Sequence, residues 1–315
     1  MAKQNIKWVI AHEPIDLFLR AAKKFSDEIN SKTDKFSFEC LTLKEYSDKY
    51  NGGVQINKYD LLDHMDQGKV EMAQMYTTTL GQKHNRDMWA LDMPFLFKDH
   101  DHAARVLDGQ IGQKILSEMT NEGNVRGLAF TYSGGFRMLP SDRDINVLSD
   151  LQGMRVRVHE HSPVASETFK AVGAEPVQLM LEEINEGVAK DMIDAGESTY
   201  PRYYSLKQNE ALPTINDTQH SLFLTSVLIN DNFWAEMDAA DQEVIQSAAL
   251  SAAVTERAES IADIKKVEEV CAKDGININK MSESVTAEWK AATAHLYDKF
   301  EDMFTPGLLK AIKEA

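Results

Sequence analysis

The spacing of apolar residues in the first part of the chain switches between the strand and the helix period. Residues 6–10 form a short apolar run typical of a strand, and Pro14 opens a segment whose apolar residues recur every three or four positions. Residues 36–40 alternate like a half-buried strand, 59–65 predict a short helix, and 70–75 predict a third strand. This order predicts an α/β fold: an open sheet with helices on both faces.

Polar residues follow two of these predicted strands. In an open α/β sheet, ligands bind just beyond the carboxyl ends of the strands. His12 and Glu13 follow the first strand, and Tyr76 and Thr77 follow the third. These four residues are therefore candidates for ligand binding.

The second half of the chain repeats the alternation. Helical patterns at residues 163–172 and 181–189 are interleaved with strand-like runs at 125–132, 154–158, 176–179 and 192–195. Two successive α/β units predict two lobes, and because no Gly- or Ser-rich linker separates them, we expect the chain to pass between lobes more than once. The expected lobes are discontinuous and comprise residues 1–133 plus 224–262, and residues 134–223 plus 263–315.

One helical segment is unusually long. From Asp238, which can cap a helix, to Gly275, which can end one, about 36 residues contain neither Pro nor Gly. At 1.5 Å per residue this segment would span roughly 54 Å, more than the width of one lobe. The pattern predicts either one helix crossing both lobes or two helices with a break near Ser251 or Thr255.

The composition is that of a folded, soluble protein. Of 315 residues, 43% are hydrophobic and 27% are charged, with 50 acidic against 34 basic side chains and a formal net charge of −16. Such a negative field disfavours nucleic acid and anionic lipid surfaces as partners. No apolar run is long enough for direct membrane insertion. The start, MAKQNIKWVIAHEP, has no apolar signal core and fits either a cytosolic protein or a mature secreted domain.

The two cysteines lie in unrelated contexts. Cys40 belongs to an alternating strand pattern and Cys271 to the long helical pattern. We expect two buried, unpaired thiols rather than a disulfide.

Motifs for catalysis or cofactors are absent. The chain has no glycine-rich nucleotide loop, no nucleophile elbow and no Cys-x-x-Cys pair, so we expect no cofactor. His159 to His161 and Asp99 to His102 concentrate metal-ligand residue types, but short tracts of this kind are usually solvated, and Asp99 or Asp101 more simply caps the helix that follows. We predict no metal and no catalytic residue.

Two other classes of protein remain as alternatives at this point. One is a cytosolic α/β enzyme acting on a carboxylate, with His12 or His161 as general base, and the other is a sensor or scaffold.

Two arginines form the strongest chemical signal. Arg137 and Arg157 each lie at or near the end of a strand-like run, within a stretch that extends from Ser133 to Tyr200. The planar guanidinium group matches a carboxylate with two parallel hydrogen bonds, so two such groups aimed at one cleft make an organic-anion site.

The same stretch carries most of a resemblance to a known family. Five segments occur in order at family-like spacing: MPFLFKDHDHAARVLDG, GGFRMLPSDRDI, DLQGMRVRV, FKAVGAEPV and EEINEGVAKDMIDAGEST. Together they resemble the DctP-like substrate-binding proteins of tripartite ATP-independent periplasmic (TRAP) transporters. The similarity extends weakly over nearly the whole chain.

This resemblance implies a fold and a function. The fold is the two-lobed, type II-like periplasmic binding fold with a long helix that spans both lobes. The implied protein is a periplasmic monomer that closes over a small organic acid and delivers it to the small and large TRAP membrane subunits. Closure would bend hinges near residues 132–135 and 223–225.

The resemblance also assigns residues. Arg157 matches the family's carboxylate-clamping arginine and Arg137 a second ligand-contacting arginine, whereas we expect Arg155 to point away. Ser198 stands where relatives offer an Asn amide, and Leu181 where relatives often place an aromatic ring over the ligand. Glu183 and Asp194 match acidic positions that we expect to be structural.

The departures from the family concern the choice of ligand. Relatives that bind sialic acid carry an acidic residue where this chain has Tyr76, so sialic acid is disfavoured. The remaining polar set fits a hydroxy or keto acid, a sugar acid or a sulfonate, and it comprises His12, Glu13, Tyr76, Thr77, Ser198, Tyr200 and Arg202. Glu13 or Glu160 could instead recognise the amine of a zwitterion.

Overall fold

The structure, a computed structural model, describes residues 3–315 and contains two compact units. Unit 1 consists of the chain up to Asn85, Ala104–Tyr132 and Leu224–Glu259, and unit 2 consists of Arg86–Ala103, Ser133–Phe223 and Ser260–Ala315. Residues 86–103, which we expect in the first lobe, pack within unit 2. There, the Tyr297 hydroxyl donates to the Pro94 carbonyl oxygen at 2.8 Å, and the Thr305 amide donates to Asp87 Oδ1 at 2.8 Å.

Unit 1 contains a five-stranded sheet. Its strands lie in the order β2 (Phe36–Thr42), β1 (Gln4–Ile10), β3 (Met72–Tyr76), β10 (Leu222–Asn230) and β4 (Val125–Phe136). The β1 strand is parallel to both β2 and β3, whereas β10 is antiparallel to β3. The carboxyl ends of the first three strands therefore lie at one edge of the sheet.

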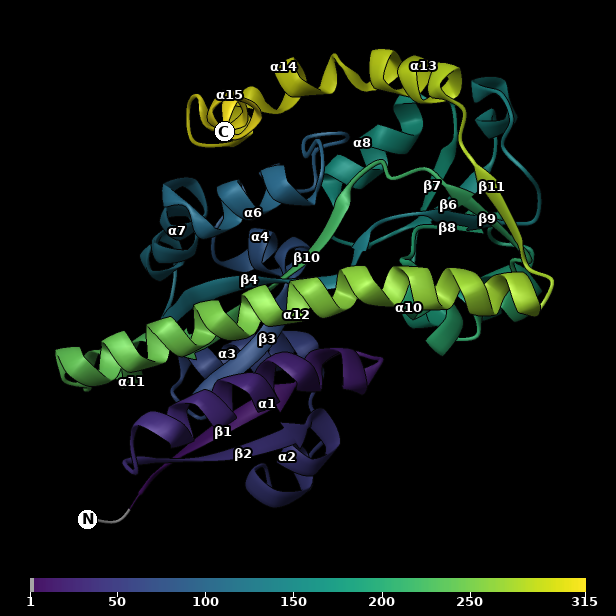
Figure 1. Ribbon diagram of the computed structural model, residues 1–315. Coiled ribbons are helices and arrows are strands. Elements are labelled where there is room, and N and C mark those ends of the chain that lie inside the picture. Colours follow the sequence, from purple (N-terminus) through teal and green to yellow (C-terminus); the bar gives the residue numbers. More distant parts are fainter. Residues whose placement is uncertain (1–2) are drawn as a thin grey trace. The chain divides into compact units, whose positions relative to one another are not determined.

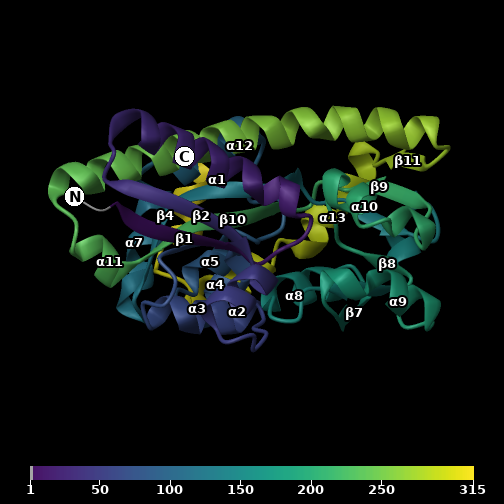
Figure 2. The ribbon, with the colours of Figure 1, turned by 90° about the horizontal axis from the view of Figure 1, so that it is seen from below.

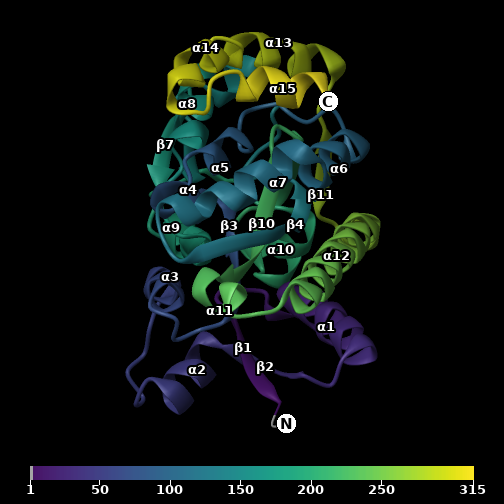
Figure 3. The same ribbon diagram turned by 90° about the vertical axis from the view of Figure 1, so that its left-hand side faces the viewer.

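Helices cover both faces of this sheet, as the sequence predicts. The α1 helix (Ile15–Lys32) and the first part of α12 (Ala239–Lys273) lie on one face, and α3 (Lys58–Asp66) and α4 (Thr77–Lys83) lie on the other (Figures 2 and 3). The remaining helices of unit 1 are α2 (Leu43–Tyr50), α7 (Gln110–Ser117) and α11 (Asp231–Ala235), while α6 (His100–Asp108) has residues in both units.

The α2 helix is absent from the sequence prediction because its eight residues carry little apolar periodicity. A capping box begins it: the Glu45 amide donates to Thr42 Oγ1 at 3.2 Å, and the Thr42 amide donates to Glu45 Oε2 at 2.8 Å.

The long helical pattern forms one continuous helix, α12, of 35 residues (Figure 1). The Asp238 carboxylate accepts the Asp241 amide at 2.9 Å, and the helix ends before Gly275, whose φ of +74° suits the left-handed stop. Its first part packs on β4, where Gln246 Nε2 donates to the Leu128 carbonyl oxygen at 2.8 Å. The alternative of two helices with a break is wrong. Among residues 3–315, neither this helix nor another is both long and apolar enough to cross a bilayer.

Unit 2 contains a six-stranded sheet in which all strands but β5 run in the same direction. The strand order is β11 (Asn277–Lys280), β9 (Thr214–Asp217), β5 (Leu139–Ser141), β8 (Ala195–Gly196), β6 (Arg155–Val158) and β7 (Glu175–Gln178). The carboxyl ends of β6, β8, β9 and β11 therefore share one edge, where ligands commonly bind.

Apolar clusters cover the two faces of this second sheet. On one face, Val156 and Val158 pack with Phe169 of α8 (Pro163–Ala171) and Trp289 of α13 (Glu283–Thr293). On the other face, Tyr200 and Tyr203 pack with Ile215 and Cys271. The other helices of unit 2 are α5 (Asp87–Ala90), α9 (Ile184–Ala189), α10 (Tyr200–Ser205), α14 (Leu296–Phe300) and α15 (Leu308–Glu314).

The two cysteines are free thiols. Cys271 is buried, as predicted, but the prediction of a buried Cys40 is wrong. Cys40 lies on β2, the edge strand of its sheet, and its side chain is exposed.

Candidate ligand-binding site

Backbone pairing brings three predicted site residues onto neighbouring segments of unit 2. Arg157 on β6 is the register partner of Gly196 on β8, and Ser198 just beyond β8 exchanges two backbone hydrogen bonds with Met138, at 2.9 and 3.1 Å. The Arg137 amide donates to the Ser221 carbonyl oxygen at 2.8 Å. The sheet thus aligns the arginines and the serine along its carboxyl edge.

The β6 strand separates its apolar and cationic residues by face. Val156 and Val158 enter the core, so Arg157 points to the opposite side. Arg155, two residues earlier, is on the same side as Arg157 by the alternation of a strand, so the expectation that it points the other way is wrong. The two differ in position along the strand instead: Arg155 pairs with Asp191 and Asp194 at 2.7 and 2.6 Å at the half-exposed start of β6.

Arg137 lies between two buried acids. Its Nη2 is 3.3 Å from Asp92 Oδ1 and its Nη1 is 3.5 Å from Glu197 Oε2. The guanidinium carbon lies 4.0 Å from the centre of the Phe223 ring, a cation–π contact. Asp92, Glu197 and Arg137 are all less than 6% exposed, so Arg137 neutralises acids that would otherwise be buried without a counter-ion.

Glu197 also binds His220. His220 Nε2 lies 3.0 Å from Glu197 Oε1, and Thr218 Oγ1 lies 2.7 Å from His220 Nδ1. The Trp289 ring stacks on the imidazole at 5.5 Å with an interplanar angle of 8°. Burial opposes ionisation of Glu197, but Arg137, the bond from His220 and Arg157 together hold its pKa below the ordinary value.

Within residues 3–315, Arg157 is buried without a carboxylate as close as the two beside Arg137. Its side chain is 2% exposed, its Nε donates to the Leu179 carbonyl oxygen at 2.7 Å, and its Nη2 has no hydrogen-bond partner among the described residues. Burial, aided by the like charges of Arg137 and Arg202, lowers the pKa of Arg157 to about 10, although Glu197 acts in the opposite direction. The group therefore stays cationic at neutral pH.

Arg202 is a third buried arginine of unit 2. It is fully buried, its Nη1 donates to Ser133 Oγ at 2.9 Å, and its guanidinium carbon lies 5.5 Å from the centre of the Phe223 ring. We define the arginine cluster as Arg137, Arg157 and Arg202 with the acids Asp92 and Glu197. Burial raises the pKa of Asp92 to about 7 against the opposing effect of Arg137, so the negative charge of this acid is partial near neutral pH.

The other predicted residues of unit 2 have different surroundings. Ser198 is buried near the arginines, and its Oγ has no hydrogen-bond partner within residues 3–315. Leu181 packs in an apolar cluster with Ile184, Ile193 and Leu212. Tyr200 packs in an apolar cluster with Tyr203, Ile215 and Cys271, with Lys280 Nζ at 5.7 Å from its ring centre. Glu160 is half-buried and pairs with His161 at 3.8 Å.

The two acids expected to be structural do have structural partners. Glu183 Oε2 accepts the Met180 amide at 2.7 Å, at the start of the short helical turn 181–183. Asp194 Oδ2 accepts both the amide of Arg155, at 2.8 Å, and its Nε, at 3.0 Å.

The predicted residues of unit 1 gather at the carboxyl ends of β1 and β3. The His12 imidazole stacks on the Tyr76 ring at 3.6 Å, and Thr77 Oγ1 donates to the Leu224 carbonyl oxygen at 3.3 Å. Glu13 is exposed, and its Oε2 accepts the Ile15 amide at 3.1 Å. His12 and Glu13 also line a cavity of about 380 Å³ with Ile10, Ala11, Ile15, Thr42, Leu43 and Lys44.

Several members of the site carry no signal in the sequence. Asp92, Trp289 and the pair His220 and Phe223 come from three distant segments, and only the fold brings them to Arg137 and Glu197. Among the described residues, His, Cys, Asp and Glu side chains form no group of three or more suited to a metal ion.

Comparison with known proteins defines the class. Residues 11–303 match the family model of bacterial extracellular solute-binding proteins, family 7. The chain belongs to this family, whose members are the solute-binding components of TRAP transporters. The predicted resemblance is therefore confirmed, and the alternative of a carboxylate enzyme is wrong, because the relatives are transport proteins.

Individual relatives agree with this assignment. The chain is 25% identical over 320 residues to the 2,3-diketo-L-gulonate-binding periplasmic protein YiaO of Escherichia coli, covering 100% of this chain and 93% of the relative. A TRAP periplasmic solute-binding protein from Xanthobacter autotrophicus with bound β-D-galacturonate superposes with a TM-score of 0.83 at 26% identity, covering 98% of this chain and 99% of the other.

A further structure extends the comparison of the fold. The counterpart from Shewanella oneidensis with bound succinate gives a TM-score of 0.85 at 21% identity, covering 99% of each chain. The predicted two-lobed α/β fold is thereby confirmed.

The two principal arginines should differ in their effect on stability. Arg137→Ala leaves Asp92 and Glu197 buried without their main counter-ion, so it should lower the free energy of unfolding by about 3–5 kcal/mol. Arg157→Ala removes an incompletely paired cation and should change that energy by less than about 1 kcal/mol. Urea unfolding of both ligand-free variants, with the exposed Arg143→Ala as control, measures the difference. Equal destabilisation by the two variants would contradict this charge assignment.

Asp92 should make stability depend on pH. Its pKa is about 7 in the folded state against an ordinary value of 3.8, so between these values the folded state holds a proton that the unfolded state lacks. Stability should then fall by roughly 1 kcal/mol per unit as the pH rises through this window. Asp92→Asn, which cannot titrate, should remove this slope, whereas Asp302→Asn on the surface should retain it. The measurement is urea unfolding from pH 4.5 to pH 7.5, and parallel curves for wild type and Asp92→Asn would refute the shift.

Proposed function

We propose that this protein captures a small organic acid in the periplasm and delivers it to TRAP membrane subunits. In this proposal Arg157 holds the ligand carboxylate and Arg137 makes a second contact. The buried Nη2 of Arg157, which has no hydrogen-bond partner among the described residues, is the observation that carries the proposal.

The electrostatics of the arginine cluster support an anionic ligand. A carboxylate would offset the positive charge of Arg157 and accept a hydrogen bond from its Nη2, which has no hydrogen-bond partner among the described residues. Each charge-assisted hydrogen bond of this kind contributes about 1.5–3 kcal/mol, so two of them could dominate the affinity of a small ligand.

The relatives support the chemical class. The ligands named for the proteins from Escherichia coli and Xanthobacter autotrophicus are both sugar acids. We infer a small carboxylate for this chain, in the range of sugar acids and hydroxy or keto acids, with a sulfonate as an isosteric option. The buried Ser198 and Arg202, and the group of His12, Glu13, Tyr76 and Thr77, are the residues we propose to select among them. The proposed site also includes Leu181, Tyr200 and Glu160. The structure supports these three less directly, because the side chains that they contact are not those of the arginine cluster.

Ligand-induced closure of the two lobes completes the proposal. The chain passes from one unit to the other within β4 and within β10, at the boundaries Tyr132/Ser133 and Phe223/Leu224. Bending at these strands would allow closure. A shift from 1:99 to 99:1 in favour of the closed state needs about 5.5 kcal/mol of differential affinity, which two arginine contacts formed on closure could supply.

Binding should require the acid group of the ligand and Arg157. D-Galacturonate, D-glucuronate, succinate and 2,3-diketo-L-gulonate form the test panel, with neutral D-galactose as the matched control. At least one acid should raise the melting temperature and bind in calorimetry, and Arg157→Ala should weaken this binding by at least about 100-fold, the equivalent of two lost charge-assisted bonds at their lower limit. Arg143→Ala should bind as the wild type does.

Two results would contradict the proposal. One is stabilisation by D-galactose as strong as that by D-galacturonate. The other is binding retained within tenfold by Arg157→Ala. Small-angle X-ray scattering of the same samples tests closure, because the radius of gyration should fall on addition of the bound acid to wild type and stay constant for Arg157→Ala.

A further inference from the structure

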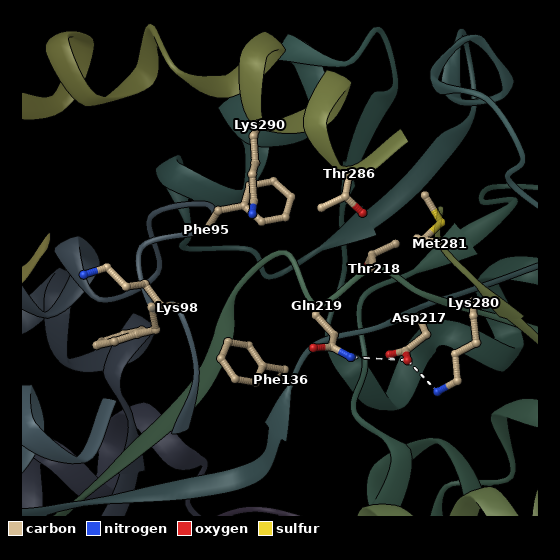
Figure 4. A pocket seen from close by; sticks show the side chains of 11 residues that line it. Phe95, Lys98, Phe136, Asp217, Thr218, Gln219, Lys280, Met281, Thr286 and Lys290 are labelled. Atoms are coloured by element: carbon tan, nitrogen blue, oxygen red, sulfur yellow. Dashed lines mark hydrogen bonds and ion pairs between the residues drawn. The ribbon is translucent and has the colours of Figure 1, made fainter. Parts of the chain in front are cut away.

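Unit 2 contains a cavity that lies outside the arginine cluster. Its volume is about 430 Å³, within the usual range for small-molecule sites (Figure 4). We name it the lysine–phenylalanine pocket. Its lining residues are Phe95, Phe97, Lys98, Phe136, Asp217, Thr218, Gln219, Lys280, Met281, Thr286 and Lys290.

The pocket occupies a position where α/β sheets commonly bind ligands. Asp217 and Lys280 are the last residues of the parallel strands β9 and β11 and are register partners. Thr218 and Gln219 follow β9 directly, so the pocket lies at the carboxyl ends of these two strands. Thr286 and Lys290, four residues apart on α13, present one face of that helix to the cavity (Figure 4).

Two of its three lysines lack a carboxylate partner among residues 3–315. Lys280 is neutralised, because its Nζ lies 2.7 Å from Asp217 Oδ2 and 2.6 Å from Glu268 Oε1. By contrast, Lys98 Nζ donates to the carbonyl oxygen of Lys313 at 3.1 Å. Lys290 Nζ lies 5.4 Å from the centre of the Phe95 ring. Two uncompensated ammonium groups at one cavity are notable in a chain whose net charge is −16, and they favour an anion.

The apolar part of the lining is aromatic. Figure 4 shows Phe95 beside Lys290 and Phe136 beside Gln219, on different sides of the cavity. Rings of this kind pack against a flat apolar group, and Lys290 next to Phe95 would place a cation close to such a group. The lining therefore suits a ligand that combines a planar body with a negative charge.

Backbone strain is concentrated at the same cavity. The residues that the structure describes include four non-glycine positions with positive φ, and two of these, Phe95 at 55° and Gln219 at 46°, line the pocket. Left-handed backbone is especially unfavourable for a bulky side chain such as Phe. The Phe95 amide is fixed by the His220 carbonyl oxygen at 2.7 Å, and Gln219 Nε2 by Asp217 Oδ2 at 3.3 Å. Strained residues held in this way are typical of ligand-binding walls.

We propose that the lysine–phenylalanine pocket is a second ligand site, which binds a small planar organic anion such as an aromatic carboxylate. Lys290 holds the acid group, Lys98 adds positive charge at the rim, and Phe95 and Phe136 flank the ring. The site does not depend on the arginine cluster, since the two share no residue.

The test uses 4-bromobenzoate as probe and the full-length Arg157→Ala protein as host. This host disables the principal carboxylate-binding group of the other site. Titration calorimetry should show saturable binding to one site, and neutral 4-bromobenzamide should bind at least tenfold more weakly. Adding Lys290→Glu should weaken 4-bromobenzoate binding at least tenfold, whereas adding Lys310→Glu, at an exposed lysine paired with Glu314, should change it less than twofold.

A crystal soaked with 4-bromobenzoate locates the probe by the anomalous signal of bromine. The signal should lie among Phe95, Phe136 and Lys290. The proposal is overturned by bromine found only elsewhere, by affinity unchanged in Lys290→Glu, or by equal binding of the amide. Lys98→Glu is a second variant at an exposed position and should weaken binding in the same direction. The host lacks Arg157, so failure of 4-bromobenzoate to bind it leaves the proposed solute-binding function intact. Loss of sugar-acid binding by Arg157→Ala, in turn, leaves the proposed lysine–phenylalanine site intact.

Discussion

The burial of charge around Arg137 is the interaction on which the rest of the site depends. Moving a guanidinium group out of water costs several kcal/mol unless carboxylates and hydrogen bonds compensate for it. Asp92 and Glu197 provide this compensation for Arg137, at 3.3 and 3.5 Å. For Arg157, the hydrogen-bond acceptor among the described residues is the Leu179 carbonyl oxygen, at 2.7 Å from Nε. Its Nη2 has no acceptor among these residues, and an anionic ligand would supply one.

The second sheet explains how such a cluster can be held in place. Parallel strands end at one edge, so Arg157, Glu197 and the 217–220 segment meet there although they are distant in sequence. His220 connects this edge to the core: it contacts Glu197, Thr218 and the Trp289 ring together. The lysine–phenylalanine pocket uses the same edge at β9 and β11, which means that one sheet positions two chemically different cavities.

Much of the fold could be predicted from apolar spacing, because each strand and helix that buries one face carries its own period. The alternating β-α order of unit 1 and the long helix α12 could be predicted from this spacing. The short α2 and the packing of residues 86–103 with unit 2 did not, since a side-chain cap and long-range contacts determine them. At the site, motif register identified Arg137 and Arg157. Asp92 and His220 could not be found, because a buried counter-ion is recognisable only when the fold places it beside its partner. Tyr200 was selected by its sequence position, and its side chain packs in the apolar cluster of Tyr203, Ile215 and Cys271.

A crystal structure of the protein with its highest-affinity organic acid tests the central claim most directly. The measured quantity is the distance from Arg157 Nη2 to the nearest ligand oxygen. We predict a carboxylate oxygen at about 2.9 Å from this nitrogen, with Arg137 still between Asp92 and Glu197. A ligand whose carboxylate is bound away from Arg157, with Nη2 still lacking an acceptor, would contradict the claim.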